Sequence, residues 1–208
     1  MIKHIWFDFE GTLTKRTDEF NRIHDELRYK TYSEAVKKPL TNELKKEFDA
    51  LYRKHGSNSA VFRHLGFESD YWQKKYCTID KKYLYMPIRE IIETLKKLKS
   101  IVPISLYTNL KMDEILLSLK IIKIEKSWFK FILSGDDVKE RKPKLDGFYE
   151  MIRKSALPPE EIMYVGDRIK VDVIPAKKLG MKTCLVWAKS NEADYSFEKF
   201  ENILSIFG

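Results

Sequence analysis

Residues 2–13 read IKHIWFDFEGTL, and this stretch decides the fold. Its first part, residues 2–8, is rich in β-branched and aromatic residues, as buried strands are, and it ends at the carboxylate of Asp8. Similar segments recur at 102–107, 131–133, 162–165 and 183–187, separated by stretches of helical periodicity at 88–99, 111–120, 145–155 and 170–179. Strands that alternate with helices in this way predict an α/β fold built on a parallel sheet.

Residues 15–86 interrupt this alternation. They contain no strand-like run, and their helical periodicity covers 18–36, 41–54, 58–65 and 70–77. A chain of 208 residues is longer than one typical domain and shorter than two, so we expect one α/β core, 1–14 with 87–208, and a helical insertion at 15–86. The insertion follows the first strand, which predicts a helical cap over the carboxyl edge of the sheet, where open α/β folds bind their ligands.

The composition is that of a globular protein, with 43% apolar and 34% charged residues. No 18 apolar residues run together and the first residues do not form a signal peptide, so we expect no membrane partner and a cytoplasmic location. Cys77 and Cys184 lie far apart, which argues against a disulfide and predicts two buried thiols. The four histidines have no metal-binding spacing, so any metal is expected to be bound by oxygen.

The formal charge of the chain is +8, which favours anionic partners. Phosphorylated metabolites and nucleic acids both fit this requirement. The lysines are spread along the chain beside acidic residues, as on ordinary solvated helix faces, which argues against a dedicated nucleic-acid surface. The sequence leaves the oligomeric state open.

Polar side chains follow the predicted strands at their carboxyl ends. Asp8 ends the first strand and Glu10 lies two residues on, so the two side chains are expected to point the same way. Two carboxylates that lie this near to each other need a cation or a proton between them. A single aspartate at a strand end commonly caps a loop, so a functional interpretation depends on the other strand ends.

Those strand ends carry matching groups. Thr108 and Asn109 follow the second strand, where they could bind an anion or cap the next helix. Lys142 stands directly before a proline that restricts the local backbone, which makes it a candidate phosphate ligand. Asp167 follows the fourth strand beside a glycine, and Asp172 falls in the first turn of the next predicted helix, where it would also favour the helix dipole.

Four segments carry these groups: DFEGTL (8–13), SLYTN (105–109), SGDDVKERKP (134–143) and VGDRIKVD (165–172). In this order they resemble the motifs of the haloacid dehalogenase (HAD) superfamily of phosphohydrolases. The resemblance implies a three-layer, Rossmann-like core with phosphatase activity. The position of the insertion resembles the helical cap of the first subclass of that superfamily.

The resemblance assigns roles residue by residue. Asp8 is expected to be the nucleophile that forms an aspartyl-phosphate, a reaction for which a carboxylate is chemically suited. Thr108, Asn109 and Lys142 are expected to bind the phosphoryl oxygens and, in the case of Thr108 and Lys142, to take part in catalysis.

The resemblance also implies a Mg²⁺ cofactor. Its expected ligands are Asp8, the backbone carbonyl of Glu10 and the acidic pair Asp167 and Asp172, of which Asp172 either binds the ion or supports a ligand. All of these are hard oxygen donors, which Mg²⁺ prefers.

Glu10 departs from the commoner pattern of the superfamily, which has aspartate here as the general acid and base. The chain also resembles enolase-phosphatases, which carry a similar DxEGT element, and this implies that the longer glutamate can serve. A general acid must come within about 2.6–3.2 Å of the atom it protonates. Glu10 is therefore expected to fold back, or the substrate to sit farther out.

The leading hypothesis is a Mg²⁺-dependent phosphomonoester hydrolase that acts on a small phosphorylated metabolite. The second is a haloacid dehalogenase-type hydrolase in which Asp8 attacks carbon, but attack on a neutral carbon needs no Mg²⁺ and leaves the other acidic groups unexplained. The third is a catalytically weak binding protein with the same fold, which would bind nucleic acid or a partner protein through its basic surface.

Substrate specificity is expected to lie in the insertion. The aromatic residues and lysines of 71–76 and 83–85 could stack a base or pack helices together. Arg16, Arg22 and Arg28 could meet a substrate anion or face solvent.

Overall fold

The computed structural model describes residues 1–80 and 84–208. The chain divides into two compact units: a core unit, Met1–Lys15 with Tyr85–Gly208, and a helical unit, Arg16–Leu84. Each unit is described by itself. Within the described residues, no helix is both long enough and apolar enough to cross a lipid bilayer.

The core unit is built on a parallel sheet. Over the described residues its six strands follow the order β3-β2-β1-β4-β5-β6, and all neighbouring pairs are parallel. The strands are β1 (His4–Phe7), β2 (Ile104–Tyr107), β3 (Ile132–Leu133), β4 (Ile162–Gly166), β5 (Lys182–Val186) and β6 (Tyr195–Phe197). Because β1 lies between β2 and β4, the strand order reverses there, and open α/β sheets bind ligands at the carboxyl end of such a point.

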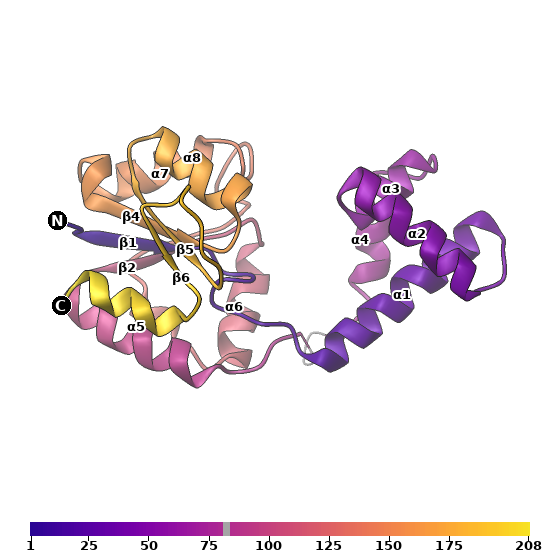
Figure 1. The fold of residues 1–208 in the computed structure, drawn as a ribbon, viewed down its shortest axis with the longest axis horizontal. Helices are drawn as coiled ribbons and strands as arrows, with labels where there is room; N and C mark the ends of the chain where they lie inside the picture. Colours follow the sequence, from indigo (N-terminus) through magenta and orange to yellow (C-terminus); the bar gives the residue numbers. More distant parts are fainter. Residues whose placement is uncertain (81–83) are drawn as a thin grey trace. The chain divides into compact units, whose positions relative to one another are not determined.

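Helices cover both faces of this sheet, which confirms the expected three-layer, Rossmann-like architecture (Figure 1). One face carries α5 (Arg89–Ile101), α6 (Met112–Ile121) and the 3₁₀ segment η5 (Phe200–Ile206), and the other carries α7 (Asp146–Ser155) and α8 (Ile174–Lys178). The short segments η2 (Lys126–Trp128) and η3 (Pro159–Glu161) precede β3 and β4. Trp6 and Tyr164 of the sheet pack with Phe148 and Met151 of α7 in one buried cluster.

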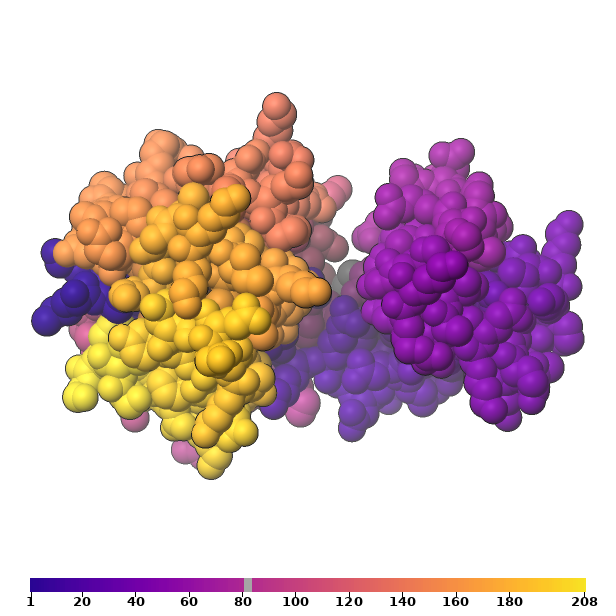
Figure 2. All heavy atoms as spheres, turned by 45° about the horizontal axis from the view of Figure 1, so that its top comes forward, coloured from indigo at the N-terminus to yellow at the C-terminus, as the bar shows by residue number. Residues whose placement is uncertain are grey.

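The last two elements of the core unit were not predicted from the sequence. Strand β6 extends the sheet beyond β5, and η5 follows it with Phe200 and Ile203 buried. Figure 2 shows this C-terminal segment, in yellow, on the surface of the unit. β6 is three residues long and only half-buried, so its sequence lacks the apolar alternation that identifies a longer strand.

The helix expected at 170–179 is present, but its first half is not α-helical. Residues Ile169–Val173 form a π-helical turn, η4, in which the N–H of Val173 donates to the carbonyl of Arg168 at 3.4 Å. Only then does α8 begin. Pro175 has no N–H to donate to the carbonyl four residues earlier, which interrupts the α-helical hydrogen bonds here.

The helical unit contains α1 (Asp18–Val36), α2 (Asn42–His55), α3 (Asn58–His64) and α4 (Tyr71–Tyr76). Thr17, Thr41 and Ser57 each accept a hydrogen bond from the N–H three residues on, which explains where the first three of these helices begin. Cys77 follows α4 and is exposed, so the prediction of two buried thiols holds for Cys184 and is wrong for Cys77.

Aromatic side chains form the apolar core of the helical unit. Trp72 stacks on Phe62 with ring centroids 5.8 Å apart, and Tyr71 packs against the same cluster. The aromatic residues of 71–76 therefore pack helices together in this structure. Of the other aromatic segment, Tyr83 lies outside the described residues.

The three arginines selected from the sequence have partners within the helical unit. Arg22 pairs with Glu19 and Glu26 on the exposed surface of α1. Arg28 contacts Asp25 and Asp49. The guanidinium of Arg16 lies 5.3 Å from the centre of the Phe20 ring.

Candidate active site

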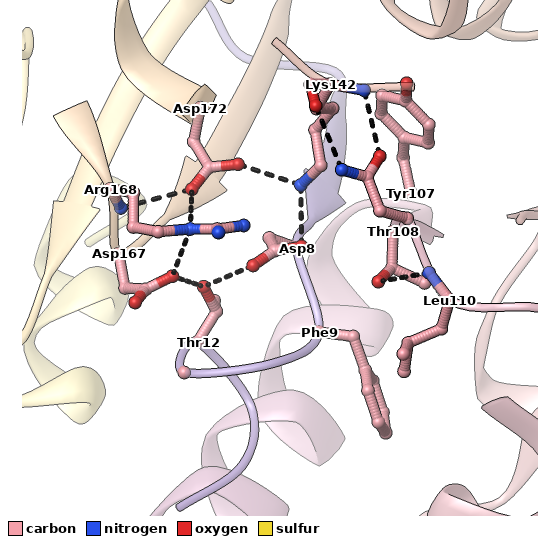
Figure 3. A network of polar contacts seen from close by, with 12 residues as sticks. Asp8, Phe9, Thr12, Tyr107, Thr108, Leu110, Lys142, Asp167, Arg168 and Asp172 are labelled. Carbon is pink, nitrogen blue, oxygen red and sulfur yellow. Dashed lines mark hydrogen bonds and ion pairs between the residues drawn. The ribbon is translucent and has the colours of Figure 1, made fainter. Parts of the chain in front are cut away.

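The candidate active site lies at the carboxyl ends of the central strands (Figure 3). Because the strands are parallel, chain segments far apart in the sequence reach the same edge of the sheet. Five of the side chains selected from the sequence lie there: Asp8 after β1, Thr108 after β2, Lys142 in the loop after β3, Asp167 after β4 and Asp172 in η4.

The ammonium group of Lys142 is the centre of the polar network. It donates to Asp8 Oδ1 at 2.6 Å, to the Tyr164 hydroxyl at 2.7 Å and to Asp172 Oδ1 at 2.8 Å. An ammonium has three N–H donors, so all of them are used. The side chain of Lys142 is 0% exposed, and a charge this deeply buried is retained only when it is paired and hydrogen-bonded.

Asn109 holds the backbone of Lys142 in place. Its Oδ1 accepts from the Lys142 N–H at 2.9 Å, and its Nδ2 donates to the Lys142 carbonyl at 3.0 Å. The amide that the sequence analysis offered to a phosphate therefore joins the end of β2 to the loop that carries the lysine. Thr108, beside it, is buried, and its hydroxyl accepts from the Leu110 N–H at 3.4 Å.

Three carboxylates gather beside the lysine. Asp8, Asp167 and Asp172 each offer an oxygen, and these oxygens lie within 4.8 Å of one another. The hydroxyl of Thr12 lies between two of the three residues, 3.4 Å from Asp8 Oδ2 and 3.3 Å from Asp167 Oδ1. The indole N–H of Trp187 donates to the Thr12 carbonyl at 3.1 Å and so supports this loop.

The negative charge of these three carboxylates favours binding of a cation. Burial, followed by the negative charges of Asp8 and Asp172, raises the pKa of Asp167 to about 6. The Arg168 guanidinium offsets part of this charge, with its Nε 3.9 Å from Asp167 and 3.8 Å from Asp172. Three hard oxygen donors with a surplus of negative charge fit Mg²⁺.

Two glycines allow the carboxylates to come so close. Gly11 has a φ of +82°, and a Cβ there would lie 2.4 Å from Asp167 Oδ2. A Cβ on Gly166 would lie 2.4 Å from the Cβ of Asp172. Larger residues at either position would push the acidic groups apart.

The π-helical turn η4 aims Asp172 at the lysine. The Oδ2 of Asp172 accepts from the Arg168 N–H at 3.1 Å, while its Oδ1 accepts from Lys142. Asp172 is fully buried, in contrast to the partly exposed Asp167. Turns of this kind are frequent at functional sites, and here the turn gives Asp172 a contact with Lys142 that a solvent-facing helix position would lack.

Glu10 is not part of the three-carboxylate cluster. Its Oε1 accepts from the hydroxyl of Tyr85 at 2.7 Å. The structure therefore brings Asp8, Asp167 and Asp172 together around Lys142 and engages the Glu10 side chain with a different partner.

The sequence analysis missed the contribution of Tyr164. Burial raises the pKa of its phenol well above the usual value, so the group stays protonated. Its O–H donates a hydrogen bond to the Tyr107 carbonyl at 3.1 Å, and its oxygen accepts one from Lys142. The available signal was a tyrosine inside an otherwise apolar strand, because a buried phenol generally has a hydrogen-bond partner.

The fold and the site together define a Rossmann-like α/β enzyme with a carboxylate and lysine centre at the topological switch point. A family model for haloacid dehalogenase-like hydrolases matches residues 5–186. The chain belongs to this family, and it is a hydrolase.

Similar proteins agree with this assignment. A glyceraldehyde 3-phosphate phosphatase of Methanocaldococcus jannaschii is 27% identical over 99% of this chain and 97% of its own length. An enzyme of the same name from Methanopyrus kandleri is 24% identical over 88% of this chain and 83% of its own. A HAD phosphatase structure from Thermococcus onnurineus superposes with a TM-score of 0.74 at 21% identity, covering 100% of this chain and 98% of the other, which shows the same fold.

Proposed function

We propose that this hydrolase is a Mg²⁺-dependent phosphomonoesterase that acts on a small phosphorylated metabolite through an aspartyl-phosphate at Asp8. The observation that carries the proposal is the contact between the Asp8 carboxylate and the buried Lys142 ammonium, 2.6 Å apart, beside the cluster of acidic oxygens. A carboxylate oriented by a fixed positive charge is ready to attack phosphorus, and its reaction requires that the charge of the phosphoryl group be offset.

In the first step, an oxygen of Asp8 forms a bond to phosphorus while the bond to the leaving alkoxide breaks. Asp8 loses its negative charge when it becomes an acyl phosphate. The Lys142 N–H that donated to Asp8 can then donate to a phosphoryl oxygen. The Thr108 hydroxyl can donate to another phosphoryl oxygen. Asn109 contributes by holding the backbone of Lys142.

Glu10 supplies and removes protons in this scheme. It gives its proton to the leaving oxygen in the first step, and in the second step it takes a proton from the water that attacks phosphorus. The second step releases inorganic phosphate and restores the Asp8 carboxylate.

Asp8, Asp167 and Asp172, with the backbone carbonyl of Glu10, would hold the Mg²⁺ ion. When bound, the ion neutralises negative charge on the phosphoryl group. The same acidic cluster favours phosphoryl transfer over attack on a halogenated carbon, which has no such charge to neutralise.

The helical unit is proposed to act as a cap that selects the substrate. The names of the curated relatives make glyceraldehyde 3-phosphate the first substrate to test. The test is phosphate release from this compound, sugar phosphates, nucleoside monophosphates and a generic aryl phosphate, each with Mg²⁺ and with a chelator. Turnover that requires Mg²⁺ supports the proposal, and the absence of turnover across the panel contradicts it.

Glu10→Gln is expected to lower kcat/KM for an alkyl phosphate by about 10²- to 10⁴-fold, the usual contribution of a general acid. The value for an aryl phosphate, whose leaving group needs no proton, should change much less. Water activation is still lost, so the phosphoenzyme should accumulate with the aryl substrate. The measurement is steady-state kinetics with both substrates plus acid-quench detection of phosphoenzyme. Equal, small losses on both substrates would make Glu10 a spectator.

The affinity for Mg²⁺ is expected to fall with pH because of Asp167. In the folded, metal-free protein this carboxyl keeps its proton up to about pH 6. Below that pH Mg²⁺ must displace the proton, so binding should be roughly four-fold weaker at pH 5.5 than at pH 7.5. Calorimetry or Mg²⁺-induced stabilisation against heat measures this without any turnover.

Two variants test whether Asp167 is the group responsible. Asp167→Asn should weaken binding at pH 7.5 and reduce its dependence on pH, since a neutral amide is a poorer ligand and does not titrate. Asp136→Asn, which changes a half-exposed carboxylate on the loop after β3, is the matched control. An unaltered pH dependence in Asp167→Asn would place the metal elsewhere.

A further inference from the structure

The Glu10 carboxylate has a dedicated hydroxyl donor. Tyr85 lies 75 residues away in the sequence, and its O–H donates to Glu10 Oε1 at 2.7 Å. Tyr85 is 3% exposed, so water does not compete effectively for this hydrogen bond. Both residues belong to the core unit.

The tyrosine ring is itself fixed in place. Phe9, the residue between Asp8 and Glu10, packs its ring edge-to-face against that of Tyr85, with centroids 6.2 Å apart. Phe9 is fully buried. The segment that carries both proposed reactive carboxylates is therefore held on Tyr85 by an apolar contact as well as by a hydrogen bond.

We propose that Tyr85 is a positioning residue that fixes the orientation of Glu10 for both proton transfers. This inference rests on the proposed function, in which Glu10 is the acid and the base. A glutamate side chain has one more rotatable bond than an aspartate, and an unrestrained carboxyl would spend much of its time away from the leaving oxygen. The hydrogen bond from the Tyr85 hydroxyl restricts that freedom.

The hydrogen bond is compatible with both protonation states of Glu10. Oε1 accepts from Tyr85 when the group is a carboxylate and also when it is a neutral acid whose proton is on Oε2. The proton on Oε2 passes to the leaving oxygen in the first step and returns from water in the second. Tyr85 keeps its own proton throughout, so it orients the reacting group without exchanging a proton with it.

The experiment compares Tyr85→Phe with the wild type on an alkyl and an aryl phosphate. We expect kcat/KM for the alkyl phosphate to fall about ten-fold and that for the aryl phosphate to change less than about two-fold, because only the first needs the proton. The phosphoenzyme should accumulate with the aryl substrate, because water activation also depends on Glu10.

Tyr32→Phe is the matched control. Tyr32 is also buried, and its hydroxyl also donates to a glutamate, Glu47, at 2.6 Å, but in the helical unit. This variant should leave the ratio of alkyl to aryl kcat/KM unchanged. Thermal unfolding of both variants shows whether the loss of a hydroxyl has altered the fold.

Double variants test whether Tyr85 acts through Glu10. Tyr85→Phe should have no further effect on the alkyl to aryl ratio in a Glu10→Gln background, where no proton is transferred. The same holds in Glu10→Asp, where the shorter side chain does not reach the phenol. This second background also serves if one single variant folds poorly.

Each outcome of these measurements bears on one of the two proposals. Equal losses on both substrates, or an undiminished effect of Tyr85→Phe in the Glu10 variants, would overturn the role of Tyr85 and leave the phosphatase assignment intact. A wild-type protein that hydrolyses neither substrate would instead overturn the proposed function, and this inference with it.

Discussion

Asp8→Asn is expected to lower turnover of an aryl phosphate by at least about 10³-fold, since the variant lacks the proposed nucleophile and such losses are large. The change keeps the shape of the side chain, and its Oδ1 can still accept from Lys142, which retains Tyr164 and Asp172 as partners. The variant should therefore fold. The measurement is single-turnover kinetics together with thermal unfolding.

Two further results bear on this prediction. Beryllofluoride with Mg²⁺, which mimics an aspartyl-phosphate, should inhibit the wild type and stabilise it against heat, and it should not stabilise Asp8→Asn. Turnover by Asp8→Asn at the wild-type rate would rule out the aspartyl-phosphate.

Lys142→Met is expected to destabilise the protein by about 3–5 kcal/mol at pH 7.5 and to remove activity. The change leaves Asp8 and Asp172 buried without the cation that both contact, and breaking a buried ion pair from one side costs about this much. The loss of stability should shrink at pH 5.5, because burial raises the pKa of Asp172, and without the lysine this carboxyl can take up a proton more readily. Denaturant unfolding at the two pH values measures it.

The matched control for this variant is Lys144→Met, two residues away in the same loop. Lys144 is 65% exposed and its ammonium is 3.8 Å from the Glu140 carboxylate, a distance at which exposed pairs contribute little. If Lys142→Met were as stable as Lys144→Met at pH 7.5, the buried lysine would not be the counter-charge of the cluster.

The fold and the edge of the sheet that carries the site could be predicted because both depend on local patterns. A buried strand in a parallel sheet is a short apolar run, and the residues that follow such runs must meet at one edge. This is why Asp8, Lys142, Asp167 and Asp172 could be selected together. Strand β6 escaped prediction for the opposite reason, since three half-buried residues leave no such pattern.

The supporting contacts could not be predicted, because they join residues that no local pattern relates. The amide of Asn109 could in principle bind a phosphate. Only the path of the loop after β3 shows that this amide is hydrogen-bonded to the Lys142 backbone instead. The Tyr85 hydroxyl reaches Glu10 across 75 residues of sequence. The turn at η4 depends on the missing N–H of Pro175 and on which carbonyls the neighbouring N–H groups bond to. The spacing of apolar residues does not predict this hydrogen-bond pattern.

The complete burial of the Lys142 side chain determines when its rotational entropy and its hydration are lost. A lysine carries roughly 2 kcal/mol of side-chain rotational entropy, and its ammonium is strongly hydrated. In this protein both the rotational freedom and the water shell are given up when the chain folds, because the ammonium is already bound on three sides. If Asp8 is the nucleophile, as proposed, its counter-charge is already in place when a substrate arrives, and substrate binding does not have to order the lysine.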